Sequence, residues 1–323
     1  MPSPQLYRAE YSRRINRVLD YIDRHLDTPL DLDELAVVAN FSRYHFHRVF
    51  AAWMGETLGD YARRRRLECG AIKLAQRPDI PILEIALATG FGSGEAFSRA
   101  FKLKFGCTPS AWRADTEQRR ATQLAAMRAR SAERQSNPDQ ADSNSDQALG
   151  TAFDNHEVSQ QPNGEINMNV RIIDLPEVKV AYQRHIGPYG APVSAFWAET
   201  FKPWLQANAL DDQTCYGIGH DDPSLTPPEK CRYDACVEVP DSFQATGKAN
   251  LTTLPGGRYA VAQFKGTVPA IGDAWTEMLR EWLPSSGMQF DARPCFERYS
   301  KDASFDPKTG EFECELCIPV RPL

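Results

Sequence analysis

Apolar residues recur at intervals of three and four positions through the first third of the chain. The segments that show this spacing most clearly are ELAVVAN, VFAAWM, LECGAIKLA and ILEIALATG. Such spacing places one apolar stripe along a helix. Residues that end helices separate the segments, at Thr28-Pro29, Gly55, Arg77-Pro78, Gly90, Gly106 and Thr108-Pro109. Seven helices fit between these breaks, so we predict an all-α N-terminal region.

From residue 168 onward the pattern changes to alternation, which is typical of β-strands. The alternating or β-branched segments are NVRIIDL, VKVAYQRH, YDACVEV, RYAVAQF and FECELCIPV. Two segments between them, AFWAETFKPWLQ and DAWTEMLREWLP, keep helical spacing. The predicted fold class is therefore multidomain, with an all-α domain followed by an α+β domain.

The N-terminal region contains an internal repeat. ELAVVAN-F at 34–41 matches EIALATG-F at 84–91, and HRVFAAWMGETL at 47–58 matches SRAFKLKFGCTP at 98–109. Each copy predicts a short helix, a tight turn and a second helix entered through Ser or Gly. This is the plan of a helix-turn-helix, whose second helix can enter the major groove of DNA.

The C-terminal region repeats as well. VKVAYQRHIGPYGAPVSAFWAETFKPWL at 178–205 matches GRYAVAQFKGTVPAIGDAWTEMLREWL at 257–283, and each copy continues into two further strands. Each unit is predicted as strand–helix–strand–strand. Two such units related by a pseudo-twofold axis would place their sheets side by side, with the helices on one face. We expect the opposite face, lined with aromatic side chains, to form a ligand cleft.

A polar segment separates the two regions. Residues 131–167 are rich in Ser, Asn, Asp and Gln, and a segment of this composition buries too little apolar surface to offset its ordering entropy. We therefore predict three parts: two helix-turn-helix units at 8–115, a helical tail and disordered linker at 116–167, and the α+β domain at 168–323.

Charge divides along the same line. Residues 1–135 contain 22 Lys and Arg against 16 Asp and Glu, a balance of +6, whereas the remaining 15 basic and 27 acidic residues give −12. The acidic pI of 5.6 hides this division. A basic module joined to an acidic one is compatible with nucleic-acid binding by the first half.

Other chemistry finds little support. Cys314 and Cys317 form a CxxC, but residues three apart on a strand point to opposite faces, which disfavours a shared metal or a disulfide. No apolar run approaches the ~20 residues of a membrane span, and the N-terminus lacks the pattern of a signal peptide. No Ser-His-Asp arrangement or phosphate-binding glycine loop is found. We expect a cytoplasmic protein that is not an enzyme, with no cofactor and no metal.

The stretch SRYHFHRVF at 42–50 predicts a helix with a base-reading surface. Phe46, Val49 and Phe50 form its buried stripe, while Arg43, Tyr44, His47 and Arg48 project outward. Arg can contact a base edge with two hydrogen bonds, and an aromatic ring can contact a thymine methyl group. His45 and His47 lie on different sides of the helix, which disfavours a metal site. We expect the basic run Arg63–Arg66 to be a solvated helix face that also contacts phosphates.

These features resemble the DNA-binding domain of the AraC/XylS family of transcription regulators. The likeness covers about Tyr11 to Arg113, and its most specific part is GF followed by FSRAFKLKFGCTPSAWR. The resemblance implies two helix-turn-helix units that enter successive segments of the major groove of promoter DNA.

The resemblance also implies the reading residues. In the first unit they are Ser42, Arg43, Tyr44, His47 and Arg48, and in the second they are Ser93, Gly94, Glu95, Ser98, Arg99 and Lys102. Tyr44 stands where family members often carry Trp, and His47 where Gln is common, so the preferred bases cannot be transferred. Gly94 lacks a side chain and Glu95 suits a cytosine amino group better than a phosphate, so we expect the second unit to discriminate less.

In the acidic half, Glu297 is the conspicuous ionisable residue of a predicted strand core, and Gly217 is its counterpart in the other repeat. Flanked by Phe296 and Tyr299, its carboxylate could meet a cationic ligand, with the aromatic rings adding cation–π attraction. The alternative is a structural glutamate on an edge strand, or one paired with Arg298 or Lys301.

This half resembles the gyrase-inhibitor-like (GyrI-like) effector-binding domain of multidrug-responsive regulators. The likeness rests on VAYQRHIGPY, the paired tryptophan helices and RPCFERY. It implies a pocket for lipophilic, often cationic, molecules around Glu297. The pocket walls that it implies are Tyr182, Tyr189, Trp204, Tyr216, Phe264, Trp275 and Tyr299, whereas Trp197 and Trp282 are expected in the core.

Together these inferences predict a transcription regulator that binds double-stranded promoter DNA as a monomer or weak dimer, contacts RNA polymerase, and binds a small amphipathic effector. Two alternatives stay open for the C-terminal domain. It could be a hydrolase, with Glu297 as base and Tyr299 or Tyr182 as acid. It could also be a protein-docking module of the gyrase-inhibitor type.

Overall fold

The structure is a computed structural model that describes residues 4–77, 79–116, 169–283, 286–291, 293–306 and 309–322. The predicted helical tail and linker at 116–167 lie outside the described residues, apart from Thr116. The chain forms two compact units, one centred on the N-terminal helices and one on a C-terminal sheet, and each is described by itself.

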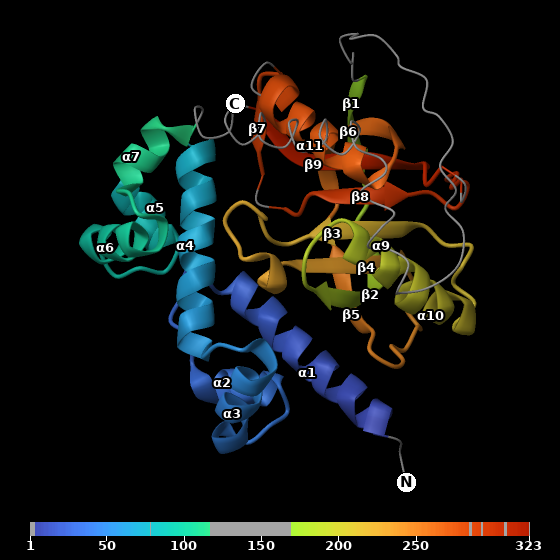
Figure 1. Ribbon diagram of the computed structural model, residues 1–323, viewed down its shortest axis with the longest axis horizontal. Helices are drawn as coiled ribbons and strands as arrows, with labels where there is room; N and C mark the ends of the chain where they lie inside the picture. The colour runs from blue at the N-terminus through green and yellow to red at the C-terminus, as the bar shows by residue number, and fades with distance from the viewer. Residues whose placement is uncertain are drawn as a thin grey trace, which may run out of the picture. The chain divides into compact units, whose positions relative to one another are not determined.

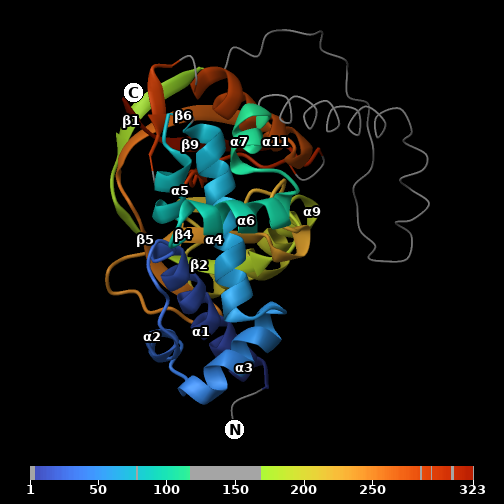
Figure 2. The same ribbon diagram turned by 90° about the vertical axis from the view of Figure 1, so that its left-hand side faces the viewer.

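The N-terminal region is helical, as predicted, with seven helices in the described residues 4–77 and 79–116, of which residues 4–17 are grouped with the C-terminal unit. They are α1 (Pro4–Arg24), α2 (Leu32–Val38), α3 (Arg43–Met54), α4 (Leu58–Gln76), α5 (Ile82–Ala88), α6 (Gly94–Phe105) and α7 (Pro109–Ala114). The helix α4 carries α2 and α3 toward one end and α5, α6 and α7 toward the other (Figures 1 and 2). In the part of the chain that is described, no helix combines the length and hydropathy that a membrane span needs.

The two helix-turn-helix units share their turn geometry. Asn40 and Gly90, which correspond in the repeat, both adopt the left-handed backbone conformation, with φ of 53° and 78°. Asn and Gly are the residues that tolerate this conformation best. In each turn the next residue, Phe41 or Phe91, donates its N–H to a carbonyl five residues earlier. The repeat in the sequence is therefore a repeat of backbone structure.

The ends of α3 and α6 match in the same way. Gly55 and Gly106 end these helices with positive φ, a conformation that favours glycine. Thr57 and Thr108 then begin α4 and α7, and each side chain accepts a hydrogen bond from the N–H three residues later. Each unit thus leads into its next helix through the same Gly-x-Thr corner.

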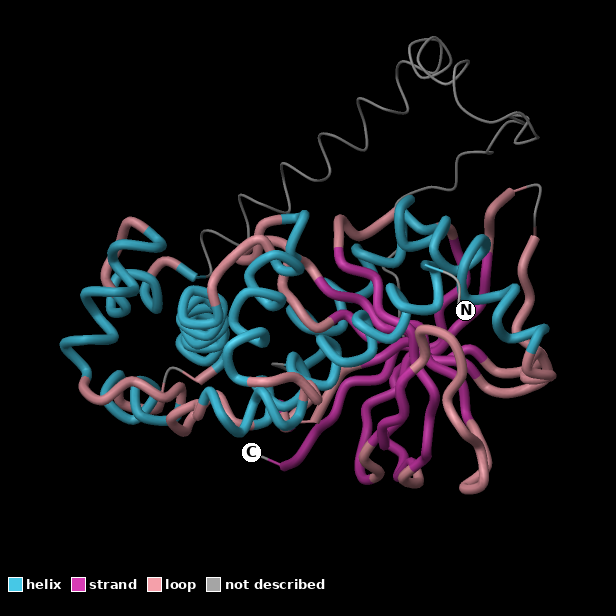
Figure 3. Tube along the Cα trace, turned by 90° about the horizontal axis from the view of Figure 1, so that it is seen from below, coloured by secondary structure: helices cyan, strands magenta, loops and turns pink. Residues whose placement is uncertain are grey.

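The C-terminal unit is built on a sheet, whose strands are drawn in magenta in Figure 3. Its strand order is β1-β6-β9-β8-β3-β4-β2-β5, and β7 also pairs with β9. Its strands are β1 (Val170–Leu175), β2 (Val178–Ile186), β3 (Cys215–Gly219), β4 (Arg232–Glu238), β5 (Asn250–Leu254), β6 (Gly257–Gly266), β7 (Met288–Phe290), β8 (Phe296–Tyr299) and β9 (Phe312–Pro322). Its helices are α9 (Ala191–Phe196), η3 (Trp197–Phe201), α10 (Lys202–Ala207), the short 3₁₀ helix η4 (Pro228–Lys230), α11 (Val268–Glu277) and η5 (Met278–Trp282). The segments η3 and η5 are π-helical turns that follow α9 and α11, with η5 placed three residues later in its repeat than η3.

The predicted strand–helix–strand–strand repeat is confirmed, and each copy exchanges one further strand with the other. β1 precedes β2 in the chain but pairs with β6, whereas β5 precedes β6 but pairs with β2. The segments Pro176-Glu177 and Pro255-Gly256 separate the two successive strands in each case. β5 escaped the sequence analysis because NLTTL is short and only weakly alternating.

Alternate residues of the strands pack on opposite faces of the sheet. On one face, Ala181, Ala235 and Val237 pack under α9 and α10, and Ala260 and Leu316 pack under α11. Their neighbours form a separate core on the other face, which contains Val180, Tyr182, Tyr216, Ile218, Cys236, Tyr259, Val261, Phe296 and Cys317. Cys314 and Cys317 lie in different cores, as the alternation predicts, and both are free thiols.

Candidate nucleic-acid interface and small-molecule site

The first candidate surface is the outer side of α3. Phe46 and Phe50 are fully buried, and Arg43, His47 and Arg48 are exposed, as predicted. These three side chains and Leu32 line a shallow hollow in the surface. Ser42 is the N-cap residue, and the Tyr44 side chain lies outside the described residues. Arg43 pairs with Asp33 at 3.0 Å, and both side chains are more than half exposed, so this ion pair can open at little cost.

The second candidate surface is the outer side of α6. Ser93 caps the helix by accepting a hydrogen bond from the N–H of Ala96. Glu95, Arg99 and Lys102 are exposed, whereas Gly94 and Ser98 are half-buried. Leu103, next to Lys102, is 82% exposed and is an apolar group that the sequence analysis did not select. Each surface therefore exposes two of the predicted cationic residues, Arg43 and Arg48 on α3 and Arg99 and Lys102 on α6, and α6 also exposes Glu95.

The basic run Arg63–Arg66 on α4 differs from its prediction as a solvated face. Arg64 and Arg65 are 10% and 8% exposed and are bonded to carboxylates of the same unit. Arg66 donates to the backbone carbonyls of Leu26 and Thr28, at 2.8 and 2.7 Å. Arg63 is exposed. The expectation is therefore wrong for Arg64 and Arg65, because both bond the buried Glu68 of the same helix, and Arg65 also bonds Asp23 of α1.

In the C-terminal unit, Glu297 of β8 is held by three neutral donors. The hydroxyl groups of Tyr233 and Tyr299 each donate to its Oε2 atom at 2.9 Å, and the Trp275 indole N–H donates to Oε1 at 3.4 Å. Burial raises the pKa of Glu297, and the three donors counteract that rise by stabilising the carboxylate. The Glu297 site, defined as Glu297 with these three residues and Trp197, thus contains an acidic group among aromatic rings.

The Glu297 site lies on the face of the sheet that carries the helices. Trp275 comes from α11, and Trp197 of η3 donates its indole N–H to the Tyr233 hydroxyl at 3.1 Å. The Trp197 ring also lies 5.4 Å from the Tyr299 ring. One tryptophan from each repeat therefore reaches the site, so Glu297 lies on the helix face and not on the opposite face, where the ligand cleft was expected.

Gly217 explains how the site fits between the two repeats. It pairs directly with Glu297 across the central strands β3 and β8. A Cβ atom at this position would overlap the Tyr233 hydroxyl and the Glu297 carboxylate. The absence of a side chain in one repeat thus makes room for the acidic side chain of the other.

Comparison with known proteins supports both halves. Residues 35–115 match the model of a helix-turn-helix domain, and residues 168–321 match that of the GyrI-like small molecule binding domain. The regulatory protein SoxS of Escherichia coli (strain K12) is 37% identical over 103 residues, which are 32% of this chain and 95% of SoxS. The chain belongs to the AraC/XylS family.

Two further relatives support the membership. The SPbeta prophage-derived protein YosT of Bacillus subtilis (strain 168) is 33% identical over 155 residues, 48% of this chain and 100% of YosT. The right origin-binding protein of Escherichia coli (strain K12) is 41% identical over 103 residues, 32% of this chain and 35% of that protein. This AraC-family chain is therefore a DNA-binding transcription regulator with a GyrI-like small-molecule binding domain.

Within the GyrI-like domain, the aromatic residues expected as pocket walls separate into three groups. Trp275 and Tyr299 bond Glu297, and Phe264 packs in the same core as they do. Tyr189 and Trp204 lie on the helix face in the core of the first repeat, with their polar atoms bonded to the Arg232 carbonyl and to Thr246.

Tyr182 and Tyr216 form the third group and need correction. Both are buried in the core on the other face of the sheet, where Tyr216 bonds Glu238 and packs against Phe296. Alternation along β3 causes this, because Tyr216 is adjacent to Gly217 and must point away from the Glu297 site. Tyr182 is therefore also unavailable as an acid for Glu297.

The sequence analysis missed Tyr233 and assigned Trp197 to the core. Tyr233 is the second residue of β4 and matches Phe312 in the other repeat, so its hydroxyl group breaks the internal symmetry. Trp197 and Trp275 correspond in the repeat, and this correspondence was the signal that both could reach one central site.

Proposed function

We propose that the GyrI-like domain binds an amphipathic cation at the Glu297 site, and that binding changes the transcription of genes whose promoters α3 and α6 recognise. The observation that carries the ligand class is the chemistry around Glu297. Each of its described hydrogen-bond partners is neutral, so the site keeps a negative charge when the carboxyl is ionised. Aromatic rings beside such a charge suit a cation with apolar substituents.

The test removes the negative charge of the Glu297 side chain and keeps the side chain's shape. In Glu297→Gln, binding of benzyltrimethylammonium should weaken about tenfold, because roughly 1.4 kcal/mol of charge-assisted attraction is lost. Binding of neopentylbenzene, its neutral carbon isostere, should change little. Calorimetry measures both, and Glu313→Gln, which removes an exposed carboxylate paired with Lys265, is the matched control. Equal losses for the two ligands would make Glu297 a structural residue.

For DNA, we propose that the reading residues are those predicted on α3 and α6. Arg48 has the exposure and the planar donors that suit a base edge. Arg48→Ala should cost about 1–3 kcal/mol of binding and relax the preference at one base position of a duplex selected by the full chain. A uniform loss on all duplexes would instead assign Arg48 to a phosphate contact. We further propose that the protein acts as a monomer or weak dimer that contacts RNA polymerase, as its family membership favours.

Hydrolysis is a second candidate, favoured by the two tyrosine hydroxyls at 2.9 Å from Glu297 Oε2. In such a pair the carboxylate can act as the general base and the phenol hydroxyl as the general acid. If this function is present, turnover of a bound ester or amide should disappear in Glu297→Gln and fall in Tyr299→Phe. If the ester or amide binds but is not hydrolysed, the result favours the sensor function over the hydrolase.

A further inference from the structure

A cluster of six charged side chains lies inside the helix-turn-helix unit, away from both candidate reading surfaces. It consists of three acids and three bases, Asp23, Glu56, Arg64, Arg65, Glu68 and Lys104, which we name the Glu68 cluster. The members come from α1, α4, α6 and the turn after α3. Their charges balance, so the cluster is neutral as a whole.

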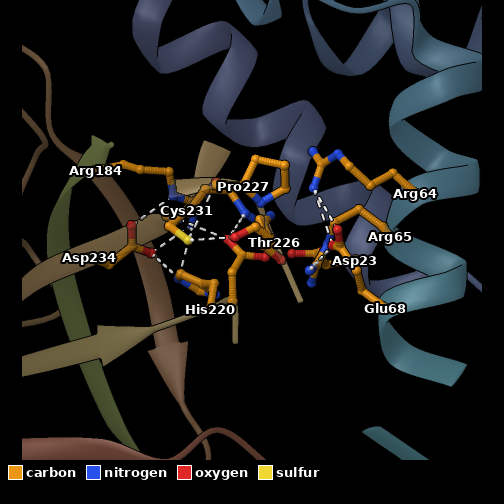
Figure 4. Close-up of polar contacts among 12 residues, drawn as sticks. Asp23, Arg64, Arg65, Glu68, Arg184, His220, Thr226, Pro227, Cys231 and Asp234 are labelled. Atoms are coloured by element: carbon orange, nitrogen blue, oxygen red, sulfur yellow. Dashed lines mark hydrogen bonds and ion pairs between the residues drawn. The ribbon is translucent and has the colours of Figure 1, made fainter. Parts of the chain in front are cut away.

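Glu68 is the centre of this cluster. It is 1% exposed and accepts hydrogen bonds from Arg64 at 3.2 Å, from Arg65 at 3.3 Å and from Lys104 at 2.8 Å. Figure 4 shows Arg64, Arg65 and Asp23 gathered around Glu68 beside α4. A buried carboxylate with three cationic partners resists displacement, since any shift of one partner exposes an uncompensated charge.

The outer bonds extend the cluster toward the helix that precedes α4. Arg64 also donates to Glu56 at 2.8 Å, and Glu56 directly follows Gly55, which ends α3. At the other side, Lys104 belongs to α6 itself. A continuous path of ion pairs therefore runs from the end of α3 through Arg64 and Glu68 to α6. Arg65 joins Asp23 of α1 to the same centre at 3.3 Å.

We propose that the Glu68 cluster fixes the separation and relative orientation of α3 and α6, and so determines the spacing between the two sets of bases that the protein accepts. This inference rests on the proposed reading role of those helices. Glu68 and Lys104 are then positioning residues that set specificity without contacting DNA. One base pair moves a contact by about 3.4 Å along the helix axis and also rotates it, so a rigid pair of reading helices must be sensitive to a single insertion.

Lys102 and Lys104 provide a matched pair on α6. Lys102 is exposed and belongs to the candidate reading surface, whereas the ammonium group of Lys104 is turned inward onto Glu68. The same substitution, Lys→Met, therefore removes a proposed DNA contact at one position and a proposed anchor at the other.

The experiment uses a duplex that the full chain selects from a random-sequence library, and a copy with one base pair inserted between its two halves. The wild type should lose about 100-fold in affinity on the inserted duplex, the order of losing the base contacts of one half. Lys104→Met should bind the selected duplex more weakly but lose only about tenfold on insertion. Lys102→Met should weaken both duplexes and keep the wild-type ratio.

An unchanged insertion ratio in Lys104→Met would overturn the proposal, because a merely structural lysine alters affinity without altering spacing preference. Glu56→Gln, which loosens an outer bond of the cluster, gives the same readout if Lys104→Met does not fold by circular dichroism. Failure of the reading role itself has another signature. The selected duplexes would then lack two separate halves, and Arg48→Ala would change no base preference.

Discussion

Glu68 and Glu297 are two glutamates in different domains, each held by three donors, and the donors differ in charge. Around Glu68 the partners are two guanidinium groups and an ammonium, whereas around Glu297 they are two phenols and an indole. The first carboxylate is neutralised inside the protein. The second has only neutral donors among its described hydrogen-bond partners, so no charge within those bonds balances it, and we propose that a cationic ligand does so.

The difference shows why burial alone does not identify a binding site. Burial opposes the charged form in both places, and it lowers the pKa of Lys104 as it raises that of Glu297. At Glu68 the cost of burying charge is offset by ion pairs within the fold. At Glu297 the neutral donors offset it only in part, and on our proposal a cationic ligand would supply the remaining compensation.

The largest expected effect follows from removing each charge in turn. Glu68→Gln leaves three cations without their central anion and should destabilise the helix-turn-helix domain by about 3–5 kcal/mol. Glu297→Gln removes a buried charge that has no cationic partner among its described hydrogen bonds, so the stability of the GyrI-like domain should stay the same or increase.

Denaturant unfolding followed for each domain separately measures this contrast. Glu95→Gln, at an exposed carboxylate of α6, is the control for charge removal alone. A loss of stability in Glu297→Gln as large as that in Glu68→Gln would break the comparison and make both glutamates structural.

The next largest effect is expected from filling the space that Gly217 leaves for the Glu297 site. Gly217→Ala places a methyl group where the Tyr233 hydroxyl and the Glu297 carboxylate lie, so both must shift. We expect a destabilisation of about 1–3 kcal/mol and loss of cation binding. Gly219→Ala is the matched control two residues along β3, since its methyl group would meet the Tyr189 side chain at ordinary contact distances of 3.5–3.7 Å. Cation binding unchanged in Gly217→Ala would show that the ligand does not use Glu297.

Local patterns predicted the helix-turn-helix units well because their geometry is set by near neighbours. The Asn40 and Gly90 turns and the Thr57 and Thr108 caps follow from residues within a few positions along the chain. The role of Arg65 could not be predicted in this way, because Asp23 lies 42 residues away from it in sequence. An arginine on a helix has the same local pattern whether water or a carboxylate faces it.

In the GyrI-like domain the internal repeat paired Glu297 with its counterpart Gly217, but Glu297 lies on the helix face rather than on the face where the cleft was expected. Which face of a sheet receives the helices depends on how the helices cross over, and periodicity within a strand does not contain that information. The alternation of side chains along β8 and β3 did predict which residues share a face with Glu297 and which do not. Once Glu297 is chosen, Phe296 and Tyr216 must point to the other face, and both lie in that core.

The smallest expected effect is a dependence on pH that has opposite signs for ligand binding and for stability. Burial raises the pKa of Glu297 above that of an unfolded glutamate, so the free protein gains a stability contribution that is fully present below the unfolded value. That contribution is lost as pH rises through the raised pKa. Cation affinity should change the other way, increasing as pH rises through the same range because the carboxyl group ionises.

Tyr233 and Tyr299 do not interfere with this measurement, because burial raises both of their pKa values well above the ordinary value for tyrosine. The expected change in cation affinity is about three- to tenfold, corresponding to an attraction of about 0.5–1.5 kcal/mol. Benzyltrimethylammonium binding and unfolding free energy, measured from pH 4 upward, should therefore change in opposite directions as Glu297 titrates. In Glu297→Gln the slope of cation affinity should vanish, and the slope of the unfolding free energy should lose the part that Glu297 contributes. Slopes of the same sign would mean that another group titrates, and that Glu297 is neutralised within the fold as Glu68 is.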